Sequence, residues 1–151
     1  ITIPVGVPEV IRAGDDITLV TYGACCRIVM VAAEMLHKVG IEAEVIDVQT
    51  LLPFDVRGII GKSLEKTGHI IFIDEDVPGG TTAYMLQEVM EKQNGFWLLD
   101  SEPRTLPGQQ HRPAYGSDGD YWSKPNAEQI FNTAYEIMNE TSPTSYPIFY
   151  K

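Results

Sequence analysis

The chain has 151 residues, of which 44% are hydrophobic and 21% are charged, as expected for a single globular domain with its own core. Its net charge of -10 and pI of about 4.6 exclude the basic face that nucleic-acid binding requires and disfavour binding to anionic membranes. The two cysteines, Cys25 and Cys26, are adjacent and show neither a disulfide framework nor metal-ligand spacing, which favours a reducing compartment.

Strand-like and helix-like patterns alternate from the start of the chain. Glu9–Arg12 is a short strand candidate, and residues 17–22 are nearly all apolar or β-branched, as in a strand that is covered on both faces. Helical spacing runs from 26 to 39 with the apolar residues on one face, and 43–48 is the next strand. Gly23 lies between the first buried strand and this helix, where a glycine permits a tight turn.

The segment after the strand at 43–48 is the most informative part of the sequence. A buried strand ends at Asp47 and turns through Thr50 and Pro53, and a helix is expected to start at Asp55, which caps it. We therefore assign Asp47 and Thr50 to the strand-end turn, and Pro53 and Asp55 to the helix start. The apolar face of this helix is predicted to consist of Val56, Ile59, Ile60 and Leu64.

A third buried strand is expected at 69–74, followed by an acidic, glycine-rich turn at 75–80. Thr81 or Thr82 is predicted to cap the next helix. The packing face of that helix is predicted to contain Ala83, Leu86, Val89 and Met90. Strands and helices that alternate through short connections predict parallel βαβ units.

After the third helix the pattern changes. Segments 96–100 and 104–106 are expected to supply one more short strand, and 107–124 is predicted to be a long loop. A final helix is predicted to start at 125–126, and its apolar residues are Ala127, Ile130, Ala134, Ile137 and Met138. The aromatic tail, 141–151, is expected either to dock on another surface or to fray.

The strand-to-helix junction at Gly23 is a candidate site, because α/β sheets bind ligands there and free backbone N–H groups favour anions. One interpretation makes Cys25 or Cys26 a thiolate activated by the helix terminus. The other makes them two small buried residues at the start of a helix. We favour the second, because no basic partner lies nearby in the sequence.

The acidic turn that contains Asp74, Glu75 and Asp76 could hold a divalent cation through oxygen ligands. A solvated turn, or an interface in which Glu75 and Asp76 face a basic partner, is the simpler interpretation. His111 and Arg112 on the predicted long loop form the remaining polar candidate, with a proton carrier beside a residue that binds carboxylates and phosphates. A surface role is the simpler interpretation here too.

Common catalytic fingerprints are missing from the sequence. It contains no G-x-G-x-x-G, P-loop, G-x-S-x-G or H-E-x-x-H motif, and no Gly-Asp-Gly segment with a later Asn of the kind that binds a diphosphate and Mg²⁺. We therefore assign no catalytic, cofactor-binding or metal-binding residue to this chain.

The order of the motifs nevertheless resembles one family. The motifs are Pro4-Val5-Gly6, residues 9–14, 16–23 and 40–47, Thr50-Leu51, Pro53, Asp55, residues 66–68, and Asp74-Glu75. This series is similar to the transketolase C-terminal domain in the E1 beta subunits of pyruvate and branched-chain 2-oxoacid (2-oxoisovalerate) dehydrogenases. The resemblance covers residues 4 to about 100, and 126–140 resembles the closing helix. Gln49 stands where the family usually has Arg, and 107–124 departs from the common pattern.

The resemblance implies a three-layer α/β/α domain with a mixed, mostly parallel sheet of about five strands, one edge strand being antiparallel. Glu9–Arg12 is the candidate for that edge strand, 1–140 is the expected domain and 141–151 is its tail. The implied function is that of the C-terminal assembly or regulatory domain of a thiamine-diphosphate-dependent E1 component. That enzyme oxidatively decarboxylates a 2-oxoacid and acylates a lipoyl group. Thiamine diphosphate and Mg²⁺ would bind outside this chain, so the fragment alone is expected to be inactive.

The partners implied by the resemblance are the remaining E1 domains or an alpha subunit, a second beta subunit, and the lipoyl acyltransferase E2 core, whose docking modules are commonly basic. Neither nucleic acid nor membrane is an expected partner. The expected compartment is the bacterial cytoplasm or the mitochondrial matrix, and a chain that starts at Ile1 without Met is expected to be a fragment. Two alternatives stay open: the C-terminal domain of a transketolase or deoxyxylulose-phosphate synthase, and a stand-alone anion-binding α/β module.

Overall fold

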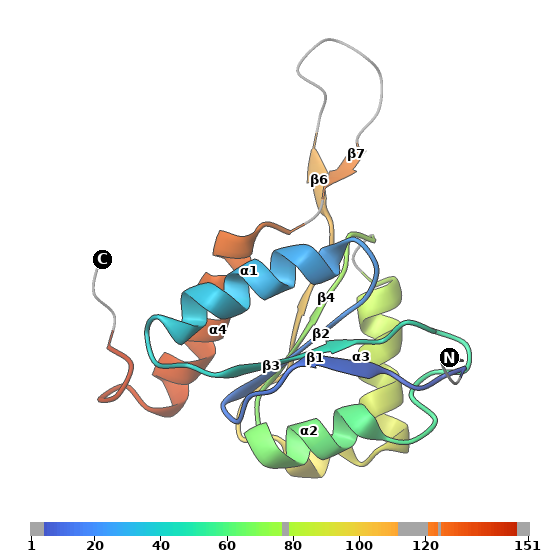
Figure 1. Cartoon of the computed structure of the whole chain (residues 1–151), viewed down its shortest axis with the longest axis horizontal. Helices are drawn as coiled ribbons and strands as arrows, with labels where there is room; N and C mark the ends of the chain where they lie inside the picture. The colour runs from blue at the N-terminus through green and yellow to red at the C-terminus, as the bar shows by residue number, and fades with distance from the viewer. Residues whose placement is uncertain (1–4, 77–78, 112–120, 124, 148–151) are drawn as a thin grey trace.

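The structure is a computed structural model that describes residues 5–76, 79–111, 121–123 and 125–147, with the backbone alone for 109–111 and 121–123. One five-stranded sheet lies between helices on both faces (Figure 1). The elements in chain order are β1 (Glu9–Arg12), β2 (Ile17–Thr21), α1 (Cys25–His37), β3 (Ala43–Asp47), α2 (Ile59–Thr67), β4 (Ile70–Ile73), α3 (Thr81–Lys92), the 3-10 helix η1 (Gly95–Leu98), β5 (Arg104–Leu106), β6 (Gln109–His111), β7 (Tyr121–Ser123) and α4 (Ala127–Thr141).

The sheet has the strand order β1-β3-β2-β4-β5. Its pairs β2–β3, β2–β4 and β4–β5 are parallel, and β1 runs antiparallel to β3 at the edge. This confirms the predicted mixed sheet with Glu9–Arg12 as its antiparallel edge strand. The chain passes from β2 to β3 on one side and later to β4 on the other, so the order of the parallel strands reverses between β2 and β4.

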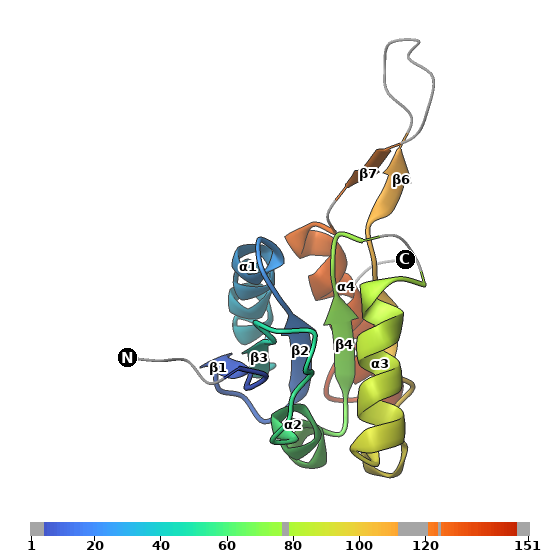
Figure 2. The same ribbon diagram turned by 90° about the vertical axis from the view of Figure 1, so that its right-hand side faces the viewer.

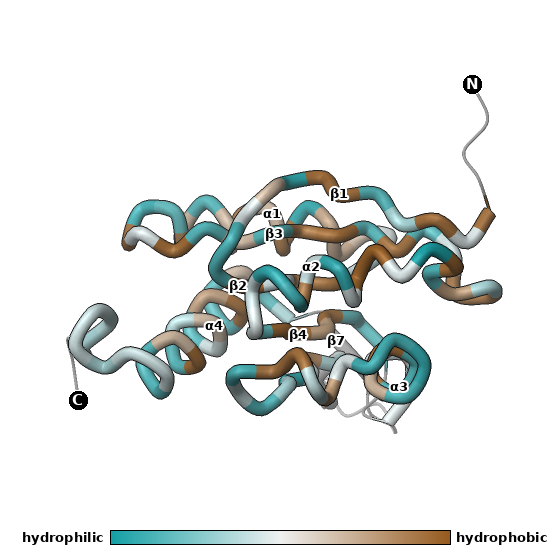
Figure 3. Tube along the Cα trace, turned by 90° about the horizontal axis from the view of Figure 1, so that it is seen from below, coloured by the Kyte–Doolittle hydropathy of each residue, from teal (hydrophilic) through white to brown (hydrophobic). Residues whose placement is uncertain are grey.

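Two hydrophobic cores cover the two faces of the sheet, because neighbouring residues of a strand point to opposite faces. Leu19 and Val45 belong to the core beneath α1 and α4, whereas Val20 and Ile46 belong to the core beneath α2 and α3. Figure 2 shows the strands between α1 on one side and α3 on the other. Figure 3 shows the hydrophobic stretches of β3 and β4 running through the interior, as the nearly continuous apolar segments predicted.

The helix after Asp55 starts later than predicted. Gly58, in a left-handed conformation with φ of 65°, precedes the first helical residue, Ile59. Asp55 still serves the helix, since its two carboxylate oxygens accept hydrogen bonds from the N–H groups of Ile59 and Ile60, each at 2.8 Å. Val56, predicted for the apolar face, is 58% exposed because it lies in the turn before the helix.

Helix α3 also differs from the prediction at its start. Gly80 is its N-cap residue and provides no side-chain hydrogen bond, so neither Thr81 nor Thr82 has the predicted capping role. Thr82 is instead buried together with Met85 and Val89 on the packing face of the helix. The sequence prediction for the packing face of α3 included Val89 but omitted Thr82 and Met85.

Of the two segments expected to supply a strand after α3, 96–100 and 104–106, only the second does so. Residues 96–100 were predicted to extend a strand, but Asn94 adopts φ of 58° and the chain then forms η1. A Cβ on Gly95 would lie 2.6 Å from the Met90 methyl carbon, so this turn packs tightly against the end of α3. Only Arg104–Leu106 forms a strand, which is β5.

The predicted loop at 107–124 contains a two-stranded antiparallel ribbon. Strands β6 and β7 pair from Gln109 with Ser123 to His111 with Tyr121. Figure 1 and Figure 2 show the ribbon projecting away from the layered body. Each strand has only three residues, and such a short pattern is difficult to recognise among the glycines and prolines of this segment.

Helix α4 begins as its sequence predicts. Asn126 and Gln129 form a capping box, in which each side chain accepts a hydrogen bond from the backbone N–H of the other residue at 2.8 Å. Beyond the helix, Asn139 donates a hydrogen bond to the Tyr146 carbonyl at 2.7 Å, and the Tyr146 ring packs edge-on against Tyr135. The tail therefore folds back onto α4 as far as it is described.

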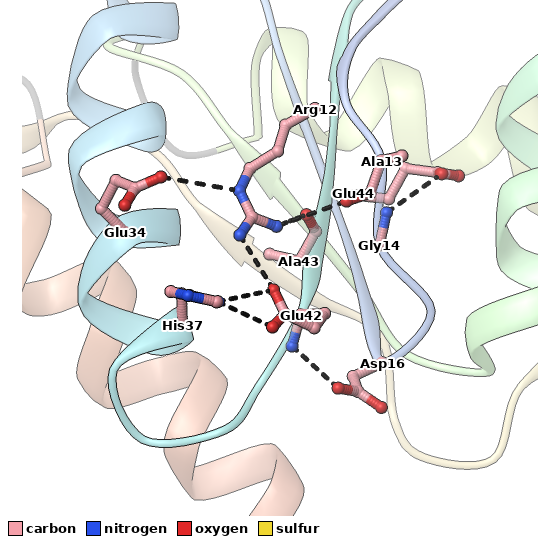
Figure 4. A network of polar contacts seen from close by, with 9 residues as sticks. All are labelled: Arg12, Ala13, Gly14, Asp16, Glu34, His37, Glu42, Ala43 and Glu44. Atoms are coloured by element: carbon pink, nitrogen blue, oxygen red, sulfur yellow. Dashed lines mark hydrogen bonds and ion pairs between the residues drawn. The ribbon is translucent and has the colours of Figure 1, made fainter.

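A charged network ties the edge strand β1 to α1 and β3 (Figure 4). The Arg12 guanidinium donates to the Glu42 carboxylate at 2.9 Å and to the Ala43 carbonyl at 2.7 Å, and His37 lies 2.7 Å from Glu42. Arg12 and then His37 lower the pKa of the Glu42 carboxyl. The cation at the end of a short strand also makes this edge a poor template for pairing with another chain.

Glu44 on β3 is a buried carboxylate, only 5% exposed. Its Oε1 atom accepts hydrogen bonds from Lys66 at 2.6 Å and from the Gly14 N–H at 3.4 Å. Burial by itself would raise the pKa of Glu44, but the hydrogen bonds from Lys66, Ser63 and Gly14 outweigh it and lower that pKa. These contacts join β3 to α2 and to the turn before β2.

We expect Glu44→Gln to lower the free energy of unfolding by about 1–2 kcal/mol at pH 7. This value already allows for the solvent that screens the partly exposed Lys66 ammonium group. Folding lowers the pKa of this carboxyl, so its contribution is complete above the ordinary value of 4.5 and is lost as the pH falls through the lower folded value. Urea unfolding at several pH values should show the difference shrinking below pH 4.5. The exposed control Glu65→Gln should change stability little, and a pH-independent Glu44→Gln effect would contradict the prediction.

Candidate interface at the carboxyl ends of the strands

The carboxyl ends of the parallel strands bring together most of the residues singled out in the sequence. Gly23 follows β2, Asp47 and Thr50 lie at the end of β3, and Glu75 and Asp76 follow β4. The strand order reverses between β2 and β4 at this edge, which is the usual position for ligands in open α/β sheets.

Two hydroxyl–carboxylate pairs engage the acidic residues that follow β4. The Tyr22 hydroxyl donates to Asp74 at 2.9 Å, and the Thr81 hydroxyl donates to Asp76 at 2.9 Å. Burial, together with the Asp74 and Asp76 carboxylates, raises the pKa of Tyr22 to about 12. The second Asp74 oxygen accepts from the Glu75 N–H at 2.7 Å. The Asp74 and Asp76 carboxylates thus each accept a hydrogen bond from a hydroxyl group, and Tyr22 and Thr81 are themselves hydrogen-bonded to each other.

Gly23 makes the turn from β2 into α1 with φ of 61°, a left-handed conformation that favours glycine. Cys25 is buried, and Cys26 lies beside the Asp47 carboxylate at the end of β3. Burial and this carboxylate raise the pKa of the Cys26 thiol to about 12. The raised pKa favours a neutral thiol at physiological pH and speaks against the interpretation of Cys26 as an activated thiolate.

Cys26 is therefore expected to react slowly with iodoacetamide. With a pKa near 12 instead of 9.0, the thiolate fraction at pH 8 falls by about 10²- to 10³-fold. The rate should be measured in a Cys25→Ser background, with the urea-unfolded chain as the reference. Asp47→Asn should speed the reaction because it removes the neighbouring negative charge. Equal rates in the folded and unfolded chains would contradict the prediction.

The turn after β3 is held by its own backbone and by the edge strand. Gln49 adopts φ of 64°, its N–H donates to the Asp47 carboxylate at 3.1 Å, and its side-chain amide donates to Glu9 on β1 at 3.1 Å. Thr50 donates its N–H to the Val48 carbonyl at 2.7 Å. At the position where the family usually has arginine, this chain thus has a hydrogen bond from a neutral amide to the Glu9 carboxylate.

Residues 51–54 are fixed to α3 from one side. Tyr84 donates its hydroxyl to the Leu51 carbonyl at 2.9 Å, and its ring packs edge-on against Phe54 at 5.9 Å. Pro53 follows a cis peptide bond and does not start the helix, contrary to the prediction. Leu52 is left 80% exposed at the tip of this rigid turn, beside a shallow hollow that Asp76 also lines.

Two further apolar side chains lie near Leu52. The Gly6 carbonyl accepts a hydrogen bond from the Val56 N–H at 2.9 Å, and a Cβ on Gly6 would lie 2.9 Å from the Pro53 ring. Val56 is 58% exposed and Val5, next to Gly6, is 70% exposed. We name Val5, Leu52, Val56, Glu75 and Asp76 the carboxyl-edge surface.

Asp55 lies behind this surface and is only 4% exposed. Besides the two N–H groups of α2, it accepts a hydrogen bond from the Gln93 side-chain amide at 2.9 Å. The Gln93 amide oxygen accepts from the Gly61 N–H at 2.7 Å, so one glutamine joins the end of α3 to the first turn of α2. Asp55 thus holds two helices together.

Sequence reasoning missed Tyr22 and Tyr84, which fix the carboxyl edge, and Gln93, which joins the end of α3 to α2. Tyr22 lies 52 residues from Asp74 in the sequence and Tyr84 lies 33 residues from Leu51, so no local pattern identifies these contacts. The backbone of His111 pairs with Tyr121 in the β6–β7 ribbon. Its side chain and the whole of Arg112 lie outside the described residues.

Among the residues that the structure describes, no group of three or more His, Cys, Asp and Glu side chains is placed to hold a metal ion. No helix in the described part of the chain has the length and apolar character needed to cross a membrane.

The five-stranded mixed sheet between two layers of helices places the chain among the three-layer α/β/α domains. Comparisons with known proteins identify its family. The profile of "Transketolase, C-terminal domain" matches residues 6–130. The chain belongs to this family.

Curated relatives include subunits of oxidoreductases. The chain is 43% identical to the 2-oxoisovalerate dehydrogenase subunit beta of Bacillus subtilis, over 70% of this chain and 32% of the relative. It is 31% identical to the mitochondrial pyruvate dehydrogenase E1 component subunit beta of Saccharomyces cerevisiae, over 85% of this chain and 35% of the relative. The chain thus spans about a third of the length of these relatives.

A solved structure shows the same fold. The chain named "Split gene transketolase, inactive beta4 tetramer" superimposes with a TM-score of 0.69, covering 92% of this chain and 43% of that chain. Its sequence identity is 23%, so the likeness supports the architecture alone.

Proposed function

We propose that this chain is the C-terminal domain of the E1 beta part of a thiamine-diphosphate-dependent 2-oxoacid dehydrogenase. The parent enzyme oxidatively decarboxylates a 2-oxoacid and transfers the acyl group to a lipoyl group. The observation that carries the proposal is the 43% identity to a 2-oxoisovalerate dehydrogenase subunit beta. This chain corresponds to about a third of that relative, so its role is assembly, and the isolated chain is inactive.

The described residues do not fit thiamine diphosphate and its Mg²⁺ ion. A diphosphate–Mg²⁺ site needs oxygen ligands that converge on one cation. Asp74 and Asp76, the best candidates, accept hydrogen bonds from the Tyr22 and Thr81 hydroxyls, and no group of three candidate ligands surrounds one position among the described residues. The cofactor accordingly belongs to other domains of the parent enzyme.

The carboxyl-edge surface is the part of this domain that packs against the rest of the parent. Leu52, Val5 and Val56 are 80%, 70% and 58% exposed on neighbouring segments, and an exposed apolar patch is characteristic of an interaction site. Glu75 and Asp76 add negative charge beside it, which suits a basic partner surface. The partners are the remaining E1 domains or an alpha subunit, a second beta subunit and the lipoyl acyltransferase core.

The domain comprises residues 1–140 with a tail at 141–151, and the parent works in the bacterial cytoplasm or the mitochondrial matrix. A reducing compartment suits the adjacent thiols of Cys25 and Cys26, which carry no structural disulfide between them. No binding of nucleic acid or membrane is proposed for a domain with a net charge of -10.

Activity of the full-length parent tests the proposal. With a lipoylated acceptor domain, the parent should consume a branched-chain 2-oxoacid or pyruvate and acylate the lipoyl group. Sugar-phosphate turnover without lipoyl acylation would instead identify the parent as a transketolase or deoxyxylulose-phosphate synthase. A thermal-shift titration with phosphate tests the anion-binding alternative, because a ligand of the folded state raises its apparent stability.

A further inference from the structure

A buried histidine lies at the amino end of β4. His69 immediately precedes the strand and is only 5% exposed. Its carbonyl accepts a hydrogen bond from the Thr18 N–H of β2 at 2.8 Å and another from the Thr67 hydroxyl at 3.1 Å. The backbone that carries the imidazole ring is therefore fixed by β2 and by the end of α2.

The segment that follows η1 packs on this histidine. The Ser101 hydroxyl oxygen lies 2.7 Å from the His69 Nδ1 atom, and the Asp100 N–H donates to the Gly68 carbonyl at 2.8 Å. Gly68 adopts φ of 74° and lies so close to Asp100 that a Cβ would collide with the Asp100 carboxylate. We name Gly68, His69, Asp100 and Ser101 the His69 seam.

The His69 seam is the polar attachment of the connection between η1 and β5. Within the part of the chain that the structure describes, no other hydrogen bond joins residues 99–103 to another element. One of the two bonds depends on the His69 ring itself. A change in the charge of this ring therefore acts directly on the contact that holds the connection.

The surroundings of the ring oppose its protonation. Burial lowers the pKa of His69 from its ordinary value of 6.5 and outweighs the opposite effect of two carboxylates. These are Asp100 in the seam and Asp16 in the turn before β2, and they are the charged groups that act on the ring. The nearest groups of β2 and α2 are the neutral Thr18 and Thr67. A protonated ring would thus be a charge that this buried position solvates poorly.

We propose that His69 is a pH-sensitive latch, which holds residues 99–103 on the amino end of β4 while its ring is neutral and releases them when the ring is protonated. In the released state water reaches the ring, so the charged form is favoured there. The sheet stays paired, and the change is confined to the connection between η1 and β5. This proposal is independent of the proposed function.

The direction of the pH dependence follows from the two states. The ring has its ordinary pKa of 6.5 in the released state and a lower one in the closed seam. The seam therefore has its full stability above pH 6.5 and loses it as the pH falls below that value. The loss ends when the pH is low enough to protonate the ring in the closed seam as well.

Hydrogen exchange of the 151-residue chain, followed by NMR from about pH 7.5 to about pH 5, tests the latch. After correction for the intrinsic exchange rate, the opening constant of the Asp100 N–H should rise by up to about tenfold per pH unit below 6.5. The Asp74 N–H, bonded to the Leu106 carbonyl at the other end of β4, is the internal control and should not change. An equal rise at both amides would overturn the proposal, because it would show a loss of global stability.

Two variants separate the His69 ring from the other histidines. His69→Gln places a neutral polar side chain at this position, so the rise at Asp100 should disappear. His37→Gln removes an exposed histidine that is bonded to Glu42, and the rise should persist. A rise that survives in His69→Gln would contradict the latch.

Titration of the His69 ring by NMR in the unchanged chain provides a second measurement that needs no variant. The ring should titrate at a lower pH in the folded chain than in the urea-unfolded chain. A midpoint in the folded chain that equals or exceeds the unfolded one would overturn the proposal, since protonation would then not open the seam.

Discussion

Replacing Phe72 by alanine is expected to lower the free energy of unfolding by about 3–5 kcal/mol. Phe72 lies on the interior strand β4 with 0% exposure, in the core between the sheet and helices α2 and α3. Its removal takes away a large apolar contact area and leaves a cavity that the rigid sheet closes only in part. Chemical denaturation of the chain, with the midpoint and the slope fitted separately, measures the loss.

Phe96→Ala provides a matched control for this experiment, because the same atoms are removed from a side chain that is 66% exposed. We expect a change within about 0.5 kcal/mol there. If the two variants lost equal stability, the core that covers this face of the sheet would be wrongly described.

Replacing Asp55 by alanine is expected to cost about 3 kcal/mol of stability. Three hydrogen bonds converge on this buried carboxylate, two from the N–H groups of Ile59 and Ile60 and one from Gln93. Alanine leaves these donors without their acceptor, and hydrogen bonds to a charged group contribute about 1.5–3 kcal/mol each before partial compensation by water. Urea unfolding of the variant checks the magnitude.

Asp55→Asn separates the carboxylate's charge from its shape. Asparagine tolerates the positive φ of 38° at this position and keeps one acceptor oxygen, so we expect about half the loss seen with alanine. Glu75→Ala, an exposed acidic residue on the same edge, should change stability by less than about 0.5 kcal/mol. Equal stability of Asp55→Ala and Glu75→Ala would show that the carboxylate does not join α2 to α3.

The sheet could be predicted from the sequence because its signal is local and repeated. Each parallel strand is a short, continuous apolar segment, and successive residues such as Leu19 and Val20 supply the cores on opposite faces. The start of α4 is equally local, since Asn126 and Gln129 satisfy each other within four residues. Such elements need no knowledge of the rest of the fold.

The errors arise where distant residues decide local structure. Asp55 looks like the first residue of a helix, yet the turn through Gly58 moves the start, and Gln93, 38 residues away, shares the carboxylate. The exposure of Leu52 has the same origin, because Tyr84 on α3 holds the turn that presents it. A hydrophobic residue is normally predicted to be inside, so an exposed apolar surface is visible only in the folded chain.

The candidate site was predicted only in part for the same reason. Gly23, Asp47 and Asp76 are conspicuous in the sequence because they follow strands. The hydrogen bonds that engage the acidic residues come from Tyr22 and Thr81, which have no motif of their own. Whether the acidic turn binds a cation or forms a hydrogen-bonded surface therefore depends on contacts that the sequence does not display.

Calorimetric titration of the purified 151-residue chain with thiamine diphosphate and Mg²⁺ is the most direct test of the central claim, which places the reacting centre on other domains of the parent. The claim predicts no saturable heat at cofactor concentrations that fully load the parent enzyme. Tight, Mg²⁺-dependent binding to this chain, removed by Asp74→Asn or Asp76→Asn, would contradict it.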